Sequence, residues 1–182
     1  SQESSLLLKL AARLSGAIDL STTRQDIDYS KLLELANGTG ANQANQVFVD
    51  SRSLASGANE TIDLSGSLTN AIGESVTFTA IKVLMIKNNG TTALTVGNAA
   101  SNQFSSYLGA AAHTMIVPAG GVALHTAPGA GFAVTAGTGD QRMGTAHVAD
   151  VDAARRHFGQ PQHFGRQTQD FEIGFEAGVA VQ

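Results

Sequence analysis

Residues 77–87 read TFTAIKVLMIK, and this stretch decides the fold class. Successive side chains of a β-strand point to opposite faces. One face would carry Phe78, Ala80, Lys82, Leu84 and Ile86, and the other would carry Ile81, Val83 and Met85. Because both faces are largely apolar, the pattern predicts the longest strand of the chain, placed centrally between two layers.

A turn signal follows this strand directly. Residues 88–91 read Asn-Asn-Gly-Thr. Asn-Gly is a strong hairpin signal because both residues tolerate a positive φ. The sequence therefore predicts a β-hairpin whose return strand covers residues 93–96.

The rest of the middle region reads as short strands separated by Gly and Pro. Further strands are expected at residues 46–50, 60–64, 114–117, 122–126 and 132–135. Turns are expected at residues 118–121 (PAGG) and 127–131 (APGAG). Many short strands at this spacing indicate a mainly β protein with an antiparallel β-sandwich or jelly-roll-like domain. Extended N- and C-terminal arms complete the predicted fold class.

Charged residues are distributed unevenly. Residues 64–139 contain only Glu74, Lys82 and Lys87. Two explanations compete and we expect each to hold in part: a compact β core with neutral polar loops, or a surface covered by other subunits. The chain has no Cys, which excludes a disulfide scaffold and a thiol nucleophile. Its net charge of −4 argues against nucleic-acid binding, and no apolar run is long enough to span a bilayer.

The N-terminal region allows two readings. Leu6, Leu7, Leu10 and Leu14 recur at a helical spacing, but the same segment also suits an extended arm that completes a sheet. Residues 28–36 show the same ambiguity, and a loop is expected at residues 37–40. We therefore divide the chain into residues 1–43 (N-terminal arm and first strands), 44–140 (β-sandwich core) and 141–182 (C-terminal arm).

The C-terminal arm has a different composition from the core. Residues 147–158 suit a short helix, and residues 171–176 (FEIGFE) alternate like a strand, which we expect to close the sheet or to be exchanged between copies. Two Phe residues on an otherwise polar arm favour burial in a groove. The candidate partner-docking residues are Arg155, Arg156, Phe158, Phe164, Phe171, Ile173 and Phe175.

No motif in the chain indicates catalysis, a metal site or a cofactor. His157 and His163, with Asp150 or Asp152, match no established metal-ligand spacing. A Gly-x-Ser-x-Gly elbow is missing, and the Gly-rich segments lack the Gly-Lys-Ser/Thr of a phosphate loop. We therefore expect a protein that is not an enzyme, with no cofactor and no metal.

Residues 45–140 contain five ordered short patches: residues 47–54 (VFVDSRSL), 61–68 (TIDLSGSL), 76–82 (VTFTAIK), 117–121 (VPAGG) and 132–140 (FAVTAGTGD). Together these patches resemble small virion structural proteins of tailed bacteriophages. The resemblance covers roughly residues 20–140 and implies a non-enzymatic β-sandwich that assembles on a particle. Related sequences run from the Gly-Thr-Gly-Asp patch straight into a final apolar strand, whereas residues 141–170 intervene here, which suggests an arm specific to this particle.

Among such virion proteins, we expect a capsid decoration or cement protein, because the low-charge middle region suits contacts between subunits and the charged termini suit arms that dock. It would bind the major capsid protein or other virion proteins as a dimer or trimer, would stabilise the shell from outside, and would be made in the host cytoplasm. A neck, tail or head-fibre component is the first alternative. A carbohydrate- or receptor-binding module is the second, although the absence of Trp argues against sugar stacking.

Overall fold

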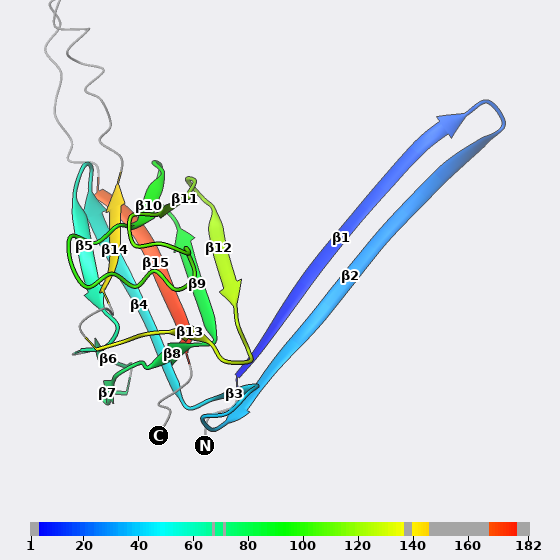
Figure 1. Cartoon of the computed structure of the whole chain (residues 1–182). Coiled ribbons are helices and arrows are strands. Elements are labelled where there is room, and N and C mark those ends of the chain that lie inside the picture. The colour runs from blue at the N-terminus through cyan, green and yellow to red at the C-terminus, as the bar shows by residue number, and fades with distance from the viewer. Residues whose placement is uncertain (1–3, 67, 71, 137–139, 146–167, 178–182) are drawn as a thin grey trace, which may run out of the picture.

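The computed structural model describes residues 4–66, 68–70, 72–136, 140–145 and 168–177. Within these residues the protein is mainly β and contains no helix. Figure 1 shows a β-stranded body from which a long N-terminal hairpin projects. The mainly β prediction is therefore confirmed, and the predicted helix at residues 147–158 lies outside the described residues.

One four-stranded sheet has the order β12–β9–β15–β4, and all its neighbours are antiparallel. Its strands are β12 (Val122–Thr126), β9 (Val83–Asn88), β15 (Thr168–Ala177) and β4 (Gln46–Ala55). β15 pairs with β4 over its whole length, from Thr168 opposite Ala55 to Ala177 opposite Gln46. The strand expected at residues 171–176 is confirmed, and it lies inside the sheet of its own chain.

The second four-stranded sheet has the order β11–β10–β14–β5 and is also antiparallel. Its strands are β11 (Thr114–Val117), β10 (Leu94–Gly97), β14 (Asp140–Thr145) and β5 (Asn59–Asp63). Two short antiparallel pairs accompany the sheets: β6 (Leu68–Thr69) with β7 (Ser75–Val76), and β8 (Ala80–Ile81) with β13 (Phe132–Ala133). The consecutive strands β4 and β5, β9 and β10, β11 and β12, and β14 and β15 belong in each case to different four-stranded sheets.

Both four-stranded sheets contribute to a single hydrophobic core. Its members include Phe48 and Ile86 from the first sheet and Ile62, Val96 and Met143 from the second. The largest fully buried apolar side chains are Leu64, Phe78, Ile81, Leu84, Ile86, Leu94, Phe104 and Met143. Because each buried side chain of this size contributes about 1.5–3 kcal/mol, this shared core is the main source of stability of the body.

The hairpin predicted at residues 88–91 is wrong. β9 and β10 do not pair with each other but lie in different sheets. Neither Asn89 nor Gly90 has the positive φ that a two-residue hairpin turn of this kind requires. The buried Asn88 instead organises a crossover: its Nδ2 donates to the carbonyl oxygens of Thr92 at 2.8 Å and Val117 at 3.0 Å. The Asn-Gly segment therefore lies in a turn that connects the two sheets.

The single long strand predicted at residues 77–87 is also wrong. The segment is divided into β8 and β9, with Lys82 between them. Their partners β13 and β12 are separated by residues 127–131. This loop between the two partner strands interrupts the ladder opposite Lys82. β9 is an inner strand of its sheet, between β12 and β15, but Met85 is 38% exposed, so the expected burial of both faces is found only in part.

The N-terminal segment is extended, so its helical reading is wrong. β1 (Ser4–Ile18) and β2 (Ser21–Asn37) pair along their length, from Ser4 opposite Leu35 to Ile18 opposite Ser21. The end of β2 pairs in parallel with β3 (Gln43–Ala44), which joins the hairpin to the body. The expectation that this arm completes a sheet is also wrong, because β1 and β2 pair with neither four-stranded sheet.

Candidate interaction surface

The hairpin of β1 and β2 has two chemically different faces. Residues directly opposite each other in an antiparallel pair point to the same face. The even-numbered residues of β1 therefore share one face with the odd-numbered residues of β2. This surface, here called the apolar face, carries Leu6, Leu8, Leu10, Ala12, Leu14, Ile18, Ile27, Tyr29 and Leu33. Within the described ribbon, residues 4–37, Lys31 is the one charged residue on it.

The opposite face of the hairpin is polar and ion-paired. Arg13 lies directly opposite Asp26, and its Nε donates to Asp26 Oδ1 at 2.9 Å. Arg24 also contacts Asp26, at 2.5 Å, and Lys9 lies 3.7 Å from Asp28. The guanidinium groups of Arg24 and Arg13 hold the pKa of Asp26 below its usual value. The charged residues of this face from Lys9 to Asp28 thus pair with one another within the ribbon.

The apolar face is buried only at its base. Leu35, which is 3% exposed, packs with Val83 and Ala44, and Leu6 and Leu33 pack against the same cluster. Farther out, Leu10 is 59% exposed and Leu14 is 71% exposed. A continuous exposed apolar surface usually marks an interaction site, and an isolated two-stranded ribbon is only marginally stable in water. The outer part of the apolar face is therefore the candidate interaction surface.

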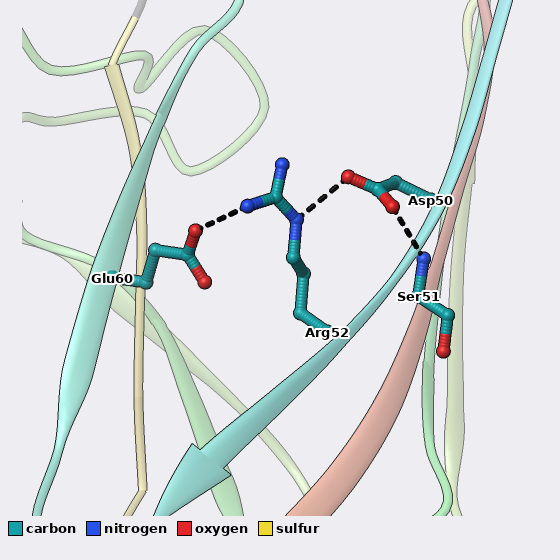
Figure 2. A network of polar contacts seen from close by, with 4 residues as sticks. All are labelled: Asp50, Ser51, Arg52 and Glu60. Carbon is teal, nitrogen blue, oxygen red and sulfur yellow. Dashed lines mark hydrogen bonds and ion pairs between the residues drawn. The ribbon is translucent and has the colours of Figure 1, made fainter.

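A polar network joins the two sheets at the edge of the body (Figure 2). Arg52 Nε lies 2.6 Å from Asp50 Oδ2, and Arg52 Nη1 lies 2.5 Å from Glu60 Oε1. Asp50 also accepts a hydrogen bond from the backbone N–H of Ser51 at 2.8 Å. Since Asp50 and Arg52 are on β4 and Glu60 is on β5, this network connects strands of different sheets.

An aromatic cluster occupies one end of the core. The rings of Phe104, His125 and Phe132 surround Tyr107, with centroids 5.2 to 6.1 Å from its own. The hydroxyl of Tyr107 donates to Gln141 Oε1 at 2.8 Å, and burial raises the pKa of Tyr107. Because the hydroxyl is satisfied inside the protein, the cluster stabilises the fold.

Lys82 is the one buried charged residue of the described part of the chain, at 2% exposure. Its Nζ donates to the carbonyl oxygen of Gly129, in the loop that interrupts the ladder. No carboxylate among the described residues lies within ion-pair distance of it. Desolvation therefore lowers the pKa of Lys82.

The docking residues expected from the sequence are only partly placed. Arg155, Arg156, Phe158 and Phe164 lie outside the described residues. The positions of Phe171, Ile173 and Phe175 are on β15, where Ile173 pairs with Ile86 and Phe175 with Phe48. β4 pairs with β15 along one whole edge, and β9 pairs with residues 171–174 on the other edge, so these positions lie inside the sheet.

The apolar face of the hairpin was missed because two periodicities coincide. Leu6, Leu10 and Leu14 fit a helix, but with Leu8 they also fit alternation. Tyr29 and Ile27 continue the alternation on the second strand. The decisive signal was thus a pair of alternating segments, residues 6–14 and 27–33, that can lie opposite each other.

Neither a metal site nor a membrane helix is found in the described part of the chain. No group of three or more His, Asp or Glu side chains there could hold a metal ion. Across the same residues, no helix has the length and apolar character needed to cross a membrane. Comparison of the chain with protein-family models, with curated proteins and with solved structures gives no match.

Proposed function

We propose that this chain is a capsid decoration protein of a tailed bacteriophage that binds the outer surface of the shell as a homodimer or homotrimer. Its two sheets form a β-sandwich that rests on the capsid. The protein holds other subunits together and catalyses no reaction.

The hairpin carries this proposal. A monomer that acted alone would have no use for a projecting ribbon whose apolar face is left in water. The small number of charged residues in segment 64–139 also supports the proposal. Lys82 is buried, so Glu74 and Lys87 are the charged side chains that this segment leaves at the surface, and most of that surface can be covered with little desolvation of charge.

The mechanism is multivalent binding. Each contact with the shell is weak, but subunits that are linked in an oligomer bind the second and third sites at a high effective concentration. The resulting avidity holds neighbouring capsid subunits together against internal pressure. The acidic balance of the chain suits the outside of the shell, away from the packaged DNA.

Besides the β-sandwich, the segment 146–167 contacts the particle. Its sequence offers Phe158 and Phe164 for a groove and Arg155 and Arg156 for acidic groups on the shell. Burial of each Phe contributes about 1.5–3 kcal/mol, which becomes large when it is repeated over a lattice.

Co-sedimentation of the purified full chain with expanded capsids tests this proposal. We expect saturable binding of many copies spread over the shell, and a higher temperature of capsid rupture when the protein is bound. The double variant Phe158→Ala with Phe164→Ala is expected to weaken binding. It leaves the core residues of the body, such as Phe104, unchanged.

Other outcomes would point elsewhere. Binding of a small fixed number of copies at one vertex would replace decoration by a neck, tail or head-fibre role. Binding of the isolated chain to a glycan array, with no affinity for capsids, would contradict a structural role and indicate a carbohydrate-binding module.

A further inference from the structure

We infer that the apolar face of the hairpin packs against the same face of the hairpin of a second copy of this chain. The inference names the surface through which copies associate. It rests on the part of the proposed function that has the protein act as an oligomer, and it does not depend on capsid binding.

Length is the first argument for this occupant. β1 has 15 residues, which at about 3.3 Å per residue makes a ribbon about 50 Å long. The longest strands of the body, β4 and β15, have ten residues each and reach only about 33 Å. The base of the hairpin is already packed on the body, so the part left to cover runs from Leu8 to Ile18 and is about 36 Å long. This is slightly more than the longest body strands, whereas the hairpin of a second copy matches it along its whole length.

Charge is the second argument. The ion pairs of Arg13 and Arg24 with Asp26 and of Lys9 with Asp28 all lie on the polar face. The apolar face carries Lys31 alone, close to the base. Two copies of a nearly neutral face can meet without repulsion, because the long Lys side chain can keep its ammonium group in water.

Area is the third argument. Two strands about 4.8 Å apart make a ribbon about 10 Å wide, so the exposed part of the apolar face, from Leu8 to Ile18, covers about 360 Å². Two such faces that meet remove about 700 Å² from water, an area typical of weak association. In a trimer each hairpin contacts two others, so each buries more apolar surface.

Order of assembly is the fourth argument. An isolated two-stranded ribbon is marginally stable, so the hairpin needs its cover when the chain folds. A second copy is the partner present at that moment, before any particle is available. Half-exposed side chains along the outer part of the face support this view; they are Leu8, Leu10, Leu14, Ile18, Ile27 and Tyr29.

A matched pair of variants tests the inference. Leu10 on the apolar face and Leu7 on the polar face are 59% and 61% exposed, so each accepts Glu with the same loss of apolar surface. Sedimentation equilibrium of the full chain, without capsids, measures the mass. We expect a dimer or trimer for the wild type, at least about a tenfold weaker association for Leu10→Glu, and a change below about twofold for Leu7→Glu.

A shortened hairpin keeps the test decisive if Leu10→Glu does not fold. Ala11 and Asp28 are register partners, so an Asn-Gly turn in place of residues 12–27 leaves the base of the hairpin, with Leu6, Leu33 and Leu35, in position. This variant is expected to be a folded monomer.

Three results would overturn the inference: a monomeric wild type, equal effects of Leu7→Glu and Leu10→Glu, or an oligomer that survives removal of residues 12–27. Each can occur while capsid binding is retained. Conversely, loss of capsid binding with a wild-type oligomer would contradict the proposed function alone.

Discussion

Leu10 of β1 and Tyr29 of β2 are register partners near the middle of the hairpin, yet they are 59% and 51% exposed. Apolar cross-strand pairs of this kind stabilise a sheet by about 0.2–1 kcal/mol, but most of their potential contribution comes from burial. The pair therefore holds the two strands in register and leaves half of its surface for a partner. The same relationship is repeated along the apolar face.

The polar face makes the pKa of Asp26 a sensitive probe of the ribbon. NMR titration is expected to place this pKa below 3.8. Because the folded value is lowered, the contribution of Asp26 to stability is present above its ordinary pKa and is lost as the pH falls through the folded pKa. Arg24→Gln should raise the pKa more than Arg13→Gln, since Arg24 has the larger effect. An Asp26 pKa at or above 3.8 would mean that these ion pairs do not form in solution.

Asn88 is expected to be essential for the crossover between the sheets. Its amide donates to carbonyl oxygens of Thr92, Val117 and Pro118, and its Oδ1 accepts from the N–H of Gly90. Asn88→Ala leaves several of these groups without a partner, so we expect a loss of about 2–4 kcal/mol in the free energy of unfolding. Urea denaturation measures this loss. The adjacent Asn89→Ala serves as the control, and an equal effect of both variants would contradict the assignment.

Arg52 is expected to stabilise the body modestly. Its side chain is 35% exposed, so solvent weakens its ion pairs with Asp50 and Glu60. We expect Arg52→Ala to lower the free energy of unfolding by about 1 kcal/mol. Arg52→Lys should recover only part of this loss, because one ammonium group cannot bridge both carboxylates as a guanidinium does. Full recovery with Lys would show that the bridging geometry is unimportant.

Lys82 is expected to lower stability at neutral pH. Its burial keeps the pKa below 10.5, so the unfolded chain binds more protons than the folded chain between the two values. Stability of the wild type should therefore rise with pH across this window. Lys82→Met is expected to be neutral or more stable by about 1 kcal/mol at pH 7, with a smaller difference at pH 10. A destabilised variant would show that the bond from Nζ to Gly129 outweighs the desolvation of the charge.

The C-terminal strands are expected to be required for folding. β14 and β15 are inner strands of the two sheets, so deletion of residues 141–182 should abolish cooperative unfolding. Replacement of residues 146–167 by a short Gly/Ser linker should preserve it. Gly144 and Thr168 pair with Asn59 and Ala55, on either side of one tight turn, so a short linker can join the ends. Thermal melts distinguish the two outcomes, and a truncated chain that still melts cooperatively would refute the prediction.

Strand positions were predictable where Gly and Pro mark the ends. β11 and β12 begin and end at the residues expected, because Pro118 and Gly121 enclose a turn closed by a 2.9 Å hydrogen bond. Which strands pair with each other could not be predicted in the same way. Asn89-Gly90 is compatible with a hairpin, and only the bonds made by Asn88 with a segment far along the chain decide for a crossover. Local sequence thus specifies turns, whereas distant contacts select which strands pair.

The hairpin illustrates the same limit in the candidate site. The spacing of Leu6, Leu10 and Leu14 is compatible with a helix, and the strand form prevails because residues 27–33 provide a matching second strand. The alternation of residues 171–176 predicted β15, but the docking role of the arm's other aromatic residues rests on composition alone. Composition indicates that Phe158 and Phe164 need cover, but it does not say what covers them.

Electron cryo-microscopy of capsids incubated with the purified full chain tests the central claim most directly. The account predicts regular density for this protein on the outer surface of the shell, repeated over the lattice, with hairpins of neighbouring copies packed through Leu10 and Tyr29. Bare capsids, with the protein left in solution as a monomer at concentrations well above those used for sedimentation, would contradict it.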